Sequence, residues 1–452
     1  MCRSFCTGAC LLNLHIRDGK LMRTSMREMP EECYNRICLK GYTHPYREYS
    51  PKRILNPMRR AGERGEGKWE QITWDEAIAE IAEKWKAITD QYGPSAMACY
   101  TGPAGNRGAA GGNGSGALLT RFKKAVGMTT VNSAVDGAGN YAPSRMLGGS
   151  YFRVANEIKD IINAKTIFIW GACPSVSQVH NVHFITEARS KGAKVITIDP
   201  LYNANASIAD QYVPLRAGTD GALALGMMNA VVENGWVDTE FITKHSVAPF
   251  LVKPDTHKFL RLSDLGRAEA KSDADKIVVM GKDGTVDIPE NIPDPVIEGT
   301  FDVEGQSVIT AYTLLLERIA EWPVERAAGI TGISAADIVE LTRTMCVDSP
   351  TTIYTVFGAD HYYNGHWNYT CMTALAILTG NLGKPGAGFC GSASAGTLYQ
   401  NLKEVSNVPC PIEKTQSLPA YSMAETILTG THNGKPFDLR GLFVNFGDPV
   451  AN

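Results

Sequence analysis

The sequence predicts an α/β fold, with a small cysteine-rich lobe at the N-terminus followed by two doubly wound α/β domains with parallel sheets. Wholly apolar runs such as 166–170 and 194–198 are typical of strands that are buried on both faces of a parallel sheet. Segments with helical spacing lie between these runs, as strand–helix–strand units require. Glycines gather in loops at 102–116 and 380–391, and such loops are where proteins with parallel sheets place their binding sites.

The domain boundaries follow from where these patterns begin and end. Residues 1–58 form the N-terminal lobe. We expect 59–150 and 351–452 to make one α/β domain, interrupted in sequence and incomplete. The other α/β domain is expected over 151–350, with a surface insert at 250–308 that is rich in Asp, Lys, Gly and Pro.

Turn and capping residues mark the first elements. Residues 18–19, Asp-Gly, predict a hairpin turn after the partly alternating run 11–16. Thr73 and Glu76 form a capping box, which predicts the start of a helix. A strand at 96–100 then leads into the first glycine-rich loop.

The later elements repeat a strand–helix unit. The strand at 166–170 precedes a helix at 180–191 and the strand at 194–198, with a right-handed crossover expected. A second unit begins with a strand at 352–357, and its helix covers 367–379.

The last strand, 441–446, repeats the pattern of a buried strand followed by glycine and proline. The first unit continues from this pattern into a second strand, whereas the sequence stops at Asn452 before the matching half. We therefore expect the chain to be a piece of a longer protein.

Composition excludes some classes of function. The net charge of −3 and the absence of a basic stripe argue against nucleic-acid binding. No apolar run reaches the length needed to cross a bilayer. No leader precedes Cys2 in the sequence as written, so we leave the location open between the cytoplasm and, if a leader was lost, the periplasm or a membrane surface.

Four early cysteines have the pattern C-x3-C-x3-C-x27-C: Cys2, Cys6, Cys10 and Cys38. This pattern favours a [4Fe–4S] cluster, which four cysteines ligate, over zinc, which prefers two tight pairs of ligands. Disulfides are disfavoured because the chain has 11 cysteines, an odd number, and most of the others are scattered singly. Cys33 is the alternative fourth ligand.

Three loops follow predicted strands or open predicted helices, and these are the positions where ligands bind in open α/β sheets. They are the loop that starts at Gly171, the strand end Asp199-Pro200, and Gly218-Thr219-Asp220, which opens a helix whose N-terminus favours a phosphate. Either aspartate alone could be an ordinary strand-end or capping residue. Together the loops predict dinucleotide binding, and the missing GxGxxG fingerprint argues against a plain nicotinamide site.

Several motifs together resemble the molybdopterin oxidoreductases of the dimethyl sulfoxide reductase family, and the resemblance covers the chain end to end. They are the cysteine pattern with Lys40-Gly41, the runs 170–171, 198–200, 218–223 and 378–386, and the closing Gly447-x-Pro449. The runs 56–60 and 64–69 are similar to catalytic subunits of membrane-linked dimethyl sulfoxide reductases, here lacking the C-terminal part.

The resemblance implies a molybdenum or tungsten ion held by two pyranopterin guanine dinucleotides, with a [4Fe–4S] cluster nearby. Asp199 and Asp220 would bind one guanine nucleotide, and the loop at Gly447 would begin the site of the other. Lys40 would lie between the cluster and the pterin, where its charge could raise the potential of the cluster. The alternative is that Lys40 is an exposed turn residue.

The family places the protein ligand of the metal in the loop that corresponds to 131–149. Asp136 is our first choice and Ser144 our second, whereas Ala142 at the ligand position would mean that the protein supplies no ligand. His361 and Asn364 could line the substrate pocket, although a lone histidine is more often bonded locally.

The function implied is oxygen-atom or hydroxyl transfer on a small substrate, as in S-oxide or N-oxide reductases. Aromatic dehydroxylation or transhydroxylation is an alternative, and hydration at the metal is a third. Two further classes are a non-catalytic, cluster-binding fragment and a plain nicotinamide dehydrogenase, against which the cysteines argue. The resemblance also implies a ferredoxin-like electron-transfer subunit, with or without a membrane anchor.

Overall fold

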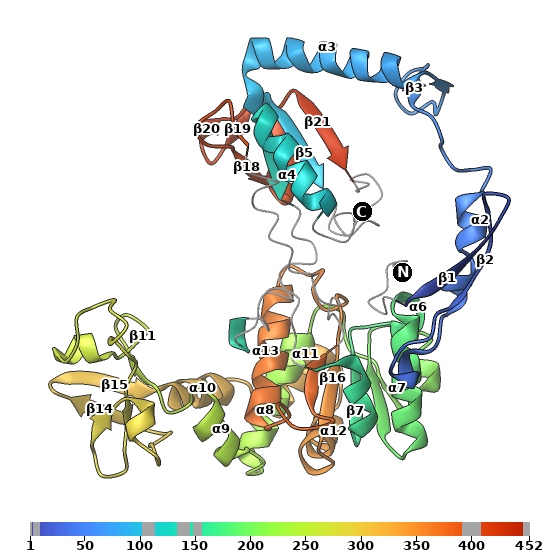
Figure 1. The fold of residues 1–452 in the computed structure, drawn as a ribbon. Coiled ribbons are helices and arrows are strands. Elements are labelled where there is room, and N and C mark those ends of the chain that lie inside the picture. The colour runs from blue at the N-terminus through green and yellow to red at the C-terminus, as the bar shows by residue number, and fades with distance from the viewer. Residues whose placement is uncertain are drawn as a thin grey trace. The chain divides into compact units, whose positions relative to one another are not determined.

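The computed structural model describes residues 2, 10–101, 114–132, 145–147, 156–390 and 408–445 (Figure 1). The chain divides into two compact units: unit 1 comprises 1–137, 178–180 and 394–452, and unit 2 comprises 138–177 and 181–393. Among the described residues, no helix has both the length and the apolar character that a bilayer-spanning helix needs.

Unit 1 begins with the N-terminal lobe. Strands β1 (Leu12–Arg17) and β2 (Lys20–Met26) pair antiparallel, and the turn between them has positive φ at Asp18 and Gly19. This confirms the predicted hairpin. The other short elements of the lobe are η1 (Glu32–Tyr34), α1 (Leu39–Tyr42), α2 (His44–Glu48), and the antiparallel pair β3 (Met58–Arg60) and β4 (Trp69–Gln71).

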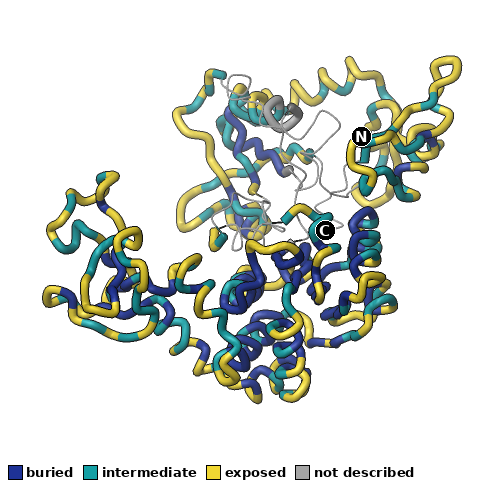
Figure 2. Tube along the Cα trace, turned by 60° about the horizontal axis from the view of Figure 1, so that its bottom comes forward, coloured by how far each residue is buried: buried dark blue, intermediate teal, exposed yellow. Residues whose placement is uncertain are grey.

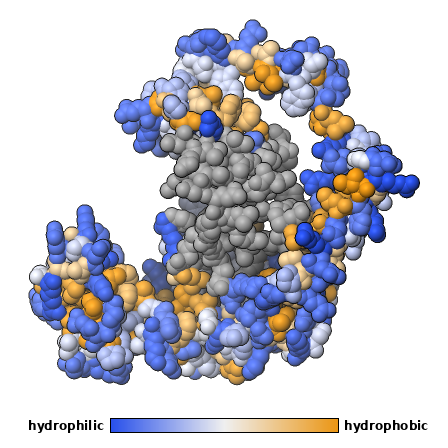
Figure 3. Space-filling view, in the orientation of Figure 1, coloured by the Kyte–Doolittle hydropathy of each residue, from blue (hydrophilic) through white to orange (hydrophobic). Residues whose placement is uncertain are grey.

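Helix α3 (Trp74–Tyr92) follows the lobe, and its first turn confirms the capping box. The backbone N–H of Glu76 donates to the hydroxyl of Thr73, and the carboxylate of Glu76 accepts from the backbone N–H of Thr73 at 2.7 Å. The helix is amphipathic, and apolar side chains stand out among hydrophilic ones along it (Figure 3).

The sheet of unit 1 is parallel, with the order β18-β6-β5-β21. Alternate residues of β5 pack on its two faces, Met97 and Cys99 on one and Ala98 and Tyr100 on the other. The elements are η2 (Pro94–Ala96), β5 (Met97–Thr101), α4 (Gly114–Val126), β6 (Thr129–Asn132), β18 (Ser417–Pro419), η8 (Ala420–Ser422), α15 (Met423–Thr429), β19 (Thr431–His432), β20 (Lys435–Pro436) and β21 (Gly441–Asn445).

Unit 2 is built on a second parallel sheet, with the order β17-β16-β7-β8-β9. The two parallel sheets confirm the predicted α/β fold class. The elements around this sheet are η4 (Ile158–Asn163), β7 (Thr166–Trp170), α6 (Pro174–Ser177), α7 (Val179–Ser190), β8 (Lys194–Ile198), η5 (Ala206–Ile208), β9 (Gln211–Val213), α8 (Asp220–Glu233), α9 (Thr239–His245), α10 (Ala311–Ala320), α11 (Val324–Thr331), α12 (Ala335–Val347), β16 (Thr351–Tyr354), α13 (Gly365–Leu378) and β17 (Gly388–Cys390).

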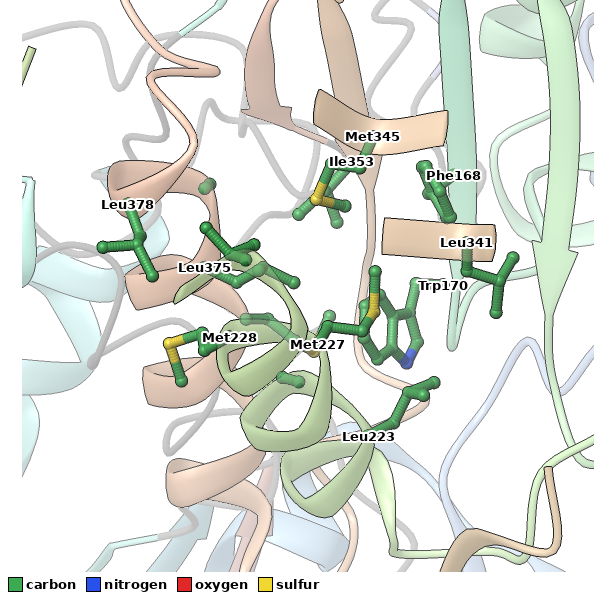
Figure 4. Close-up of a cluster of buried hydrophobic side chains, with 14 of the residues drawn as sticks. Phe168, Trp170, Leu223, Met227, Met228, Leu341, Met345, Ile353, Leu375 and Leu378 are labelled. Carbon is green, nitrogen blue, oxygen red and sulfur yellow. The ribbon is translucent and has the colours of Figure 1, made fainter. Parts of the chain in front are cut away.

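The core of unit 2 covers both faces of this sheet. Phe168 and Trp170 of β7 face the larger cluster, where α8, α12 and α13 supply many of the partners (Figure 4). Ile167 and Ile169, which alternate with them, face the smaller cluster. Each fully buried apolar side chain of this size contributes about 1.5–3 kcal/mol, so the strand ends are held by a well-packed core.

The structure changes one boundary. We expected 351–452 to join 59–150, but β16 pairs in parallel with β7, from Thr351 opposite Thr166 to Tyr354 opposite Ile169. Residues 351–390 therefore belong to the sheet of unit 2. Periodicity identifies a buried strand but carries no information about which sheet the strand joins.

The insert folds as a small antiparallel β structure with its own apolar cluster. Its residues are buried less than those around the parallel sheet (Figure 2). The elements are β10 (Leu251–Lys253), β11 (Lys258–Phe259), η6 (Leu262–Leu265), β12 (Val279–Met280), β13 (Val286–Asp287), η7 (Pro289–Asn291), β14 (Thr300–Val303) and β15 (Gln306–Thr310).

Candidate functional site

The carboxyl ends of β7, β8 and β16 meet at one edge of the sheet of unit 2. Gly171 follows β7, and its N–H donates to the carbonyl of Ile198 at 3.0 Å. Its own carbonyl accepts from the N–H of Gly358, which follows β16, at 2.9 Å. The predicted loops that follow these strands are therefore tied together by their backbones.

Two glycines at this edge are required by close approach. A Cβ on Gly358 would lie 2.2 Å from the carbonyl oxygen of Gly171. Because the clash is with backbone, only a shift of the chain could relieve it. Gly171 has φ +58°, and a Cβ there would lie 3.0 Å from the backbone nitrogen of Ala359. These glycines therefore let the loops that follow β7 and β16 pack backbone against backbone at this edge.

Asp199 ends β8 and is half-buried. One carboxylate oxygen accepts from the backbone N–H of Leu201 at 2.8 Å, across the exposed Pro200. Burial raises the pKa of Asp199, while hydrogen bonds from Leu201 and Asn203 act in the opposite direction. The remaining acceptor positions of the carboxylate can receive donors from a ligand.

Asp220 is the first residue of α8, and only 4% of it is exposed. The indole N–H of Trp170, at the end of β7, donates to one carboxylate oxygen at 2.9 Å. Burial raises the pKa of Asp220 to about 6, with a further increase from the charge of Asp199. The two carboxyl groups are thus close enough to interact.

Thr219, not Asp220, is the N-cap of α8, and its side chain makes no capping hydrogen bond. Its hydroxyl donates instead to the carbonyl of Arg216 at 2.6 Å. The reading of Asp220 as an ordinary N-cap is therefore wrong. The carboxylate is held instead by the indole of Trp170 and by the backbone N–H of Asp220 itself.

The first turn of α13 fastens the 218–221 loop. Asn364 donates to the carbonyl of Gly218 at 3.1 Å. The side chain of Asn368, which is fully buried, accepts from the N–H of Gly221 at 3.0 Å and donates to the carbonyl of Ala359 at 3.0 Å. Sequence reasoning missed Asn368, although an asparagine on a largely apolar helix, four residues after Asn364, was a usable signal.

His361 lies in the exposed turn between β16 and α13. In this turn, Asn364 and Gly358 both make hydrogen bonds to the site. A role for His361 in substrate binding stays a prediction.

The described cysteines of the N-terminal pattern lie in the lobe of unit 1. The N–H of Cys2 donates to the carbonyl of Cys10 at 2.7 Å, which brings the two ends of the close cysteine run together. The imidazole of His44 lies 3.4 Å from the sulfur of Cys2. Cys38 is the N-cap of α1, the helix that carries the half-buried Lys40.

Four of the predicted site residues lie outside the described part of the chain: Cys6, Asp136, Ser144 and Gly447. Ala142, the alternative at the ligand position, lies outside it too. Among the residues that the structure does describe, no three Cys, His, Asp or Glu side chains are grouped as metal ligands. The full cysteine set and the protein ligand of the metal therefore stay predictions.

Comparison with known proteins identifies the family. Residues 53–427 match the molybdopterin oxidoreductase model, and residues 1–50 match the molybdopterin oxidoreductase Fe4S4 domain. The chain is 30% identical to the perchlorate reductase subunit alpha of Dechloromonas aromatica, over 85% of this chain and 45% of that protein. It is 27% identical to the dimethyl sulfoxide reductase DmsA of Haemophilus influenzae, over 95% of this chain and 49% of that protein.

Among solved structures, acetylene hydratase from Pelobacter acetylenicus has the same fold, with a TM-score of 0.57 and 23% identity over 85% of this chain and 44% of that one. The chain spans about half the length of the curated relatives it matches. By its match over 53–427, the chain belongs to the molybdopterin oxidoreductase family, and its cofactors are a molybdopterin and a [4Fe–4S] cluster.

Proposed function

We propose that this chain is part of the catalytic subunit of an enzyme that passes electrons through a [4Fe–4S] cluster to a molybdenum or tungsten centre held by two molybdopterin guanine dinucleotides. The observation that carries the proposal is the pair of interacting carboxyl groups, Asp199 and Asp220, at the carboxyl edge of the parallel sheet in a chain of this family. Such a centre would supply the exchange of an oxo or hydroxyl group with a small substrate, coupled to electron transfer.

The hydrogen-bond acceptors at this edge fit a guanine base. Ionised carboxylates only accept hydrogen bonds, and the edge of guanine offers two donors, the ring N1–H and the 2-amino group. Adenine presents an unprotonated ring nitrogen at the N1 position, which would face a carboxylate lone pair to lone pair. Asp199 and Asp220 would therefore hold guanine and reject adenine.

The iron–sulfur part of the proposal depends on Cys2, Cys6, Cys10 and Cys38 as the ligands. Cys2 and Cys10 are already joined by a backbone hydrogen bond, and Cys38 starts the helix that carries Lys40. The ammonium of Lys40, two residues from a ligand, would raise the potential of the cluster and so favour its reduction.

The substrate class is proposed from the relatives. Their names record reduction of perchlorate, dimethyl sulfoxide, nitrate and chlorate, and oxidation of dimethyl sulfide. All of these are oxygen-atom transfers, so we infer the same reaction on a small S-oxide, N-oxide or oxyanion here. Asp136 or Ser144 would ligate the metal, and His361 would line the substrate pocket.

The partner is proposed on the same basis. Several relatives are named as alpha subunits or catalytic subunits, which indicates assembly with other subunits. We infer a ferredoxin-like subunit that delivers electrons to the cluster, with or without a membrane anchor.

The nucleotide part can be tested with the purified chain by equilibrium dialysis against GDP and ADP. We expect GDP to bind at least about tenfold more tightly, because each hydrogen bond to a charged group contributes roughly 1.5–3 kcal/mol. Asp199→Asn and Asp220→Asn should abolish that preference, whereas Asp255→Asn, at an exposed position of the insert, should keep it. Equal affinity for the two nucleotides in the unsubstituted chain would refute the proposal.

Metal analysis of anaerobically purified chain separates the catalytic proposal from its main alternative. Iron together with molybdenum or tungsten supports the oxidoreductase. Iron with neither metal would favour a chain that binds a cluster without a closed metal site.

A further inference from the structure

An aromatic side chain lies beside the two carboxylates and has no assigned role. Tyr362 belongs to the turn between β16 and α13. Its ring packs on Gly218, since a Cβ built on that glycine would lie 3.2 Å from Cδ1 and 3.3 Å from Cγ of the tyrosine. Asp220 and Asp199 both act on the tyrosine hydroxyl, because their charges, after burial, raise its pKa.

We propose that Tyr362 forms one wall of the base pocket and stacks its ring on the guanine whose edge Asp199 and Asp220 hold. This inference rests on the proposed function and adds the residue that recognises the face of the base. The carboxylates define the edge of the purine, and a flat apolar surface beside them completes a pocket for a planar ligand.

Two hydrogen bonds hold the turn that carries Tyr362. The carbonyl of Tyr362 accepts from the N–H of Gly365, which opens α13, at 2.9 Å. Asn364, two residues along, donates to the carbonyl of Gly218 and so joins the turn to the loop on which the ring rests. The turn is held by these bonds and the ring already packs on Gly218, so little ordering is needed when a base binds, which favours affinity.

The exposure of Tyr362 suits stacking. The residue is 37% exposed although its ring packs on Gly218, so part of the side chain stays open to a ligand. The adjacent Tyr363 is fully exposed and has no such packing, and it therefore serves as a matched control.

Gly218 forms the surface on which the ring of Tyr362 packs. Its φ of +77° favours glycine, and the absence of a Cβ lets the tyrosine ring lie directly against the backbone. A side chain here would push the ring toward the space that we assign to the base.

The test measures GDP binding by equilibrium dialysis for the unsubstituted chain and for Tyr362→Leu, Tyr362→Phe and Tyr363→Ala. Leucine still packs on Gly218 but has no aromatic face, whereas phenylalanine keeps the face and loses the hydroxyl. We expect Tyr362→Leu to weaken GDP binding roughly 5- to 100-fold, the range for loss of one base–aromatic stack. Tyr362→Phe and Tyr363→Ala should stay within about twofold of the unsubstituted chain.

A second readout does not depend on affinity. In a stacked complex, the ring current of the tyrosine shifts the H8 resonance of bound GDP upfield. The shift should persist in Tyr362→Phe and disappear in Tyr362→Leu, a difference that a purely structural role would not produce. Equal melting temperatures of the variants exclude misfolding as the cause.

The outcomes separate the two proposals. If GDP binding depends on Asp220 but Tyr362→Leu binds as the unsubstituted chain does, the stacking inference is wrong and the proposed function stands. If Tyr362→Phe loses as much affinity as Tyr362→Leu, the hydroxyl and not the ring contacts the nucleotide, and stacking is again refuted. If the unsubstituted chain does not prefer GDP to ADP, the proposed function fails first.

Discussion

The pH dependence of guanine binding follows directly from the burial of Asp220. The carboxyl group is almost fully buried, accepts one hydrogen bond from Trp170 and has a pKa raised to about 6. Only the ionised form can accept from both the base and the indole. Near pH 7 the group is mostly ionised, and at pH 5 roughly one-tenth of it is, so affinity should fall about tenfold between these values.

Guanosine is the suitable probe, since it carries no phosphate that would titrate in the same range. Its dissociation constant, measured from pH 4.5 to pH 8 by calorimetry, should be nearly constant above about pH 7, and its rise should approach tenfold per pH unit below about pH 5. Binding at pH 5 should release close to one proton, seen as a dependence of the heat on the buffer. In Asp220→Asn the residual affinity should not change over this range.

The same carboxyl group predicts the sign of a stability effect in the ligand-free chain. Its pKa is higher in the folded state than the ordinary value of 3.8, so the folded state retains a proton that the unfolded state has released. Stability is therefore lost as pH rises from about 4 through 6, by about 2–3 kcal/mol.

An unchanged guanosine affinity between pH 5 and 7, or the same pH dependence in Asp220→Asn, would refute the assignment of this carboxyl group to the base.

Two further predictions concern the sheet edge and the lobe. Gly358→Ala should lower the stability of unit 2 by about 2–4 kcal/mol, because its Cβ would meet the backbone of Gly171, whereas Gly329→Ala, in α11 with open space around it, should change the melting temperature little. A normal melting temperature for Gly358→Ala would show that the loops after β7 and β16 can move apart without loss of stability. Cys38→Ser should abolish bound iron and visible absorbance in anaerobic preparations, while Cys33→Ser should keep both; the reverse result would make Cys33 the fourth ligand.

Local chemistry made much of the fold predictable. The hairpin at 18–19 and the capping box at Thr73 depend on residues next to each other in sequence, and both are present in the structure. The wholly apolar strands 166–170 and 194–198 also occur, because burial on both faces leaves a continuous hydrophobic run. The partner of β16 was not predictable, since pairing with β7 joins residues about 185 positions apart and leaves no mark in the local pattern.

The residues of the candidate site also differ in whether the sequence alone identifies them. Asp199 and Asp220 were identifiable because each follows a strand or opens a helix, positions at which topology alone predicts ligand binding. Tyr362 was not, because its importance comes from Gly218, a residue far earlier in the chain on which its ring packs. Asn368 left the signal of an asparagine on a largely apolar helix, but its bond to Gly221 is visible only in the structure. In the proposed site, the carboxylates contact the edge of the base, and carboxylates at these positions follow from the architecture alone. Stacking on the face of the base depends on the contact between Tyr362 and Gly218, which forms only when β16 joins the sheet that contains β7. The tyrosine could therefore be found only in the folded chain.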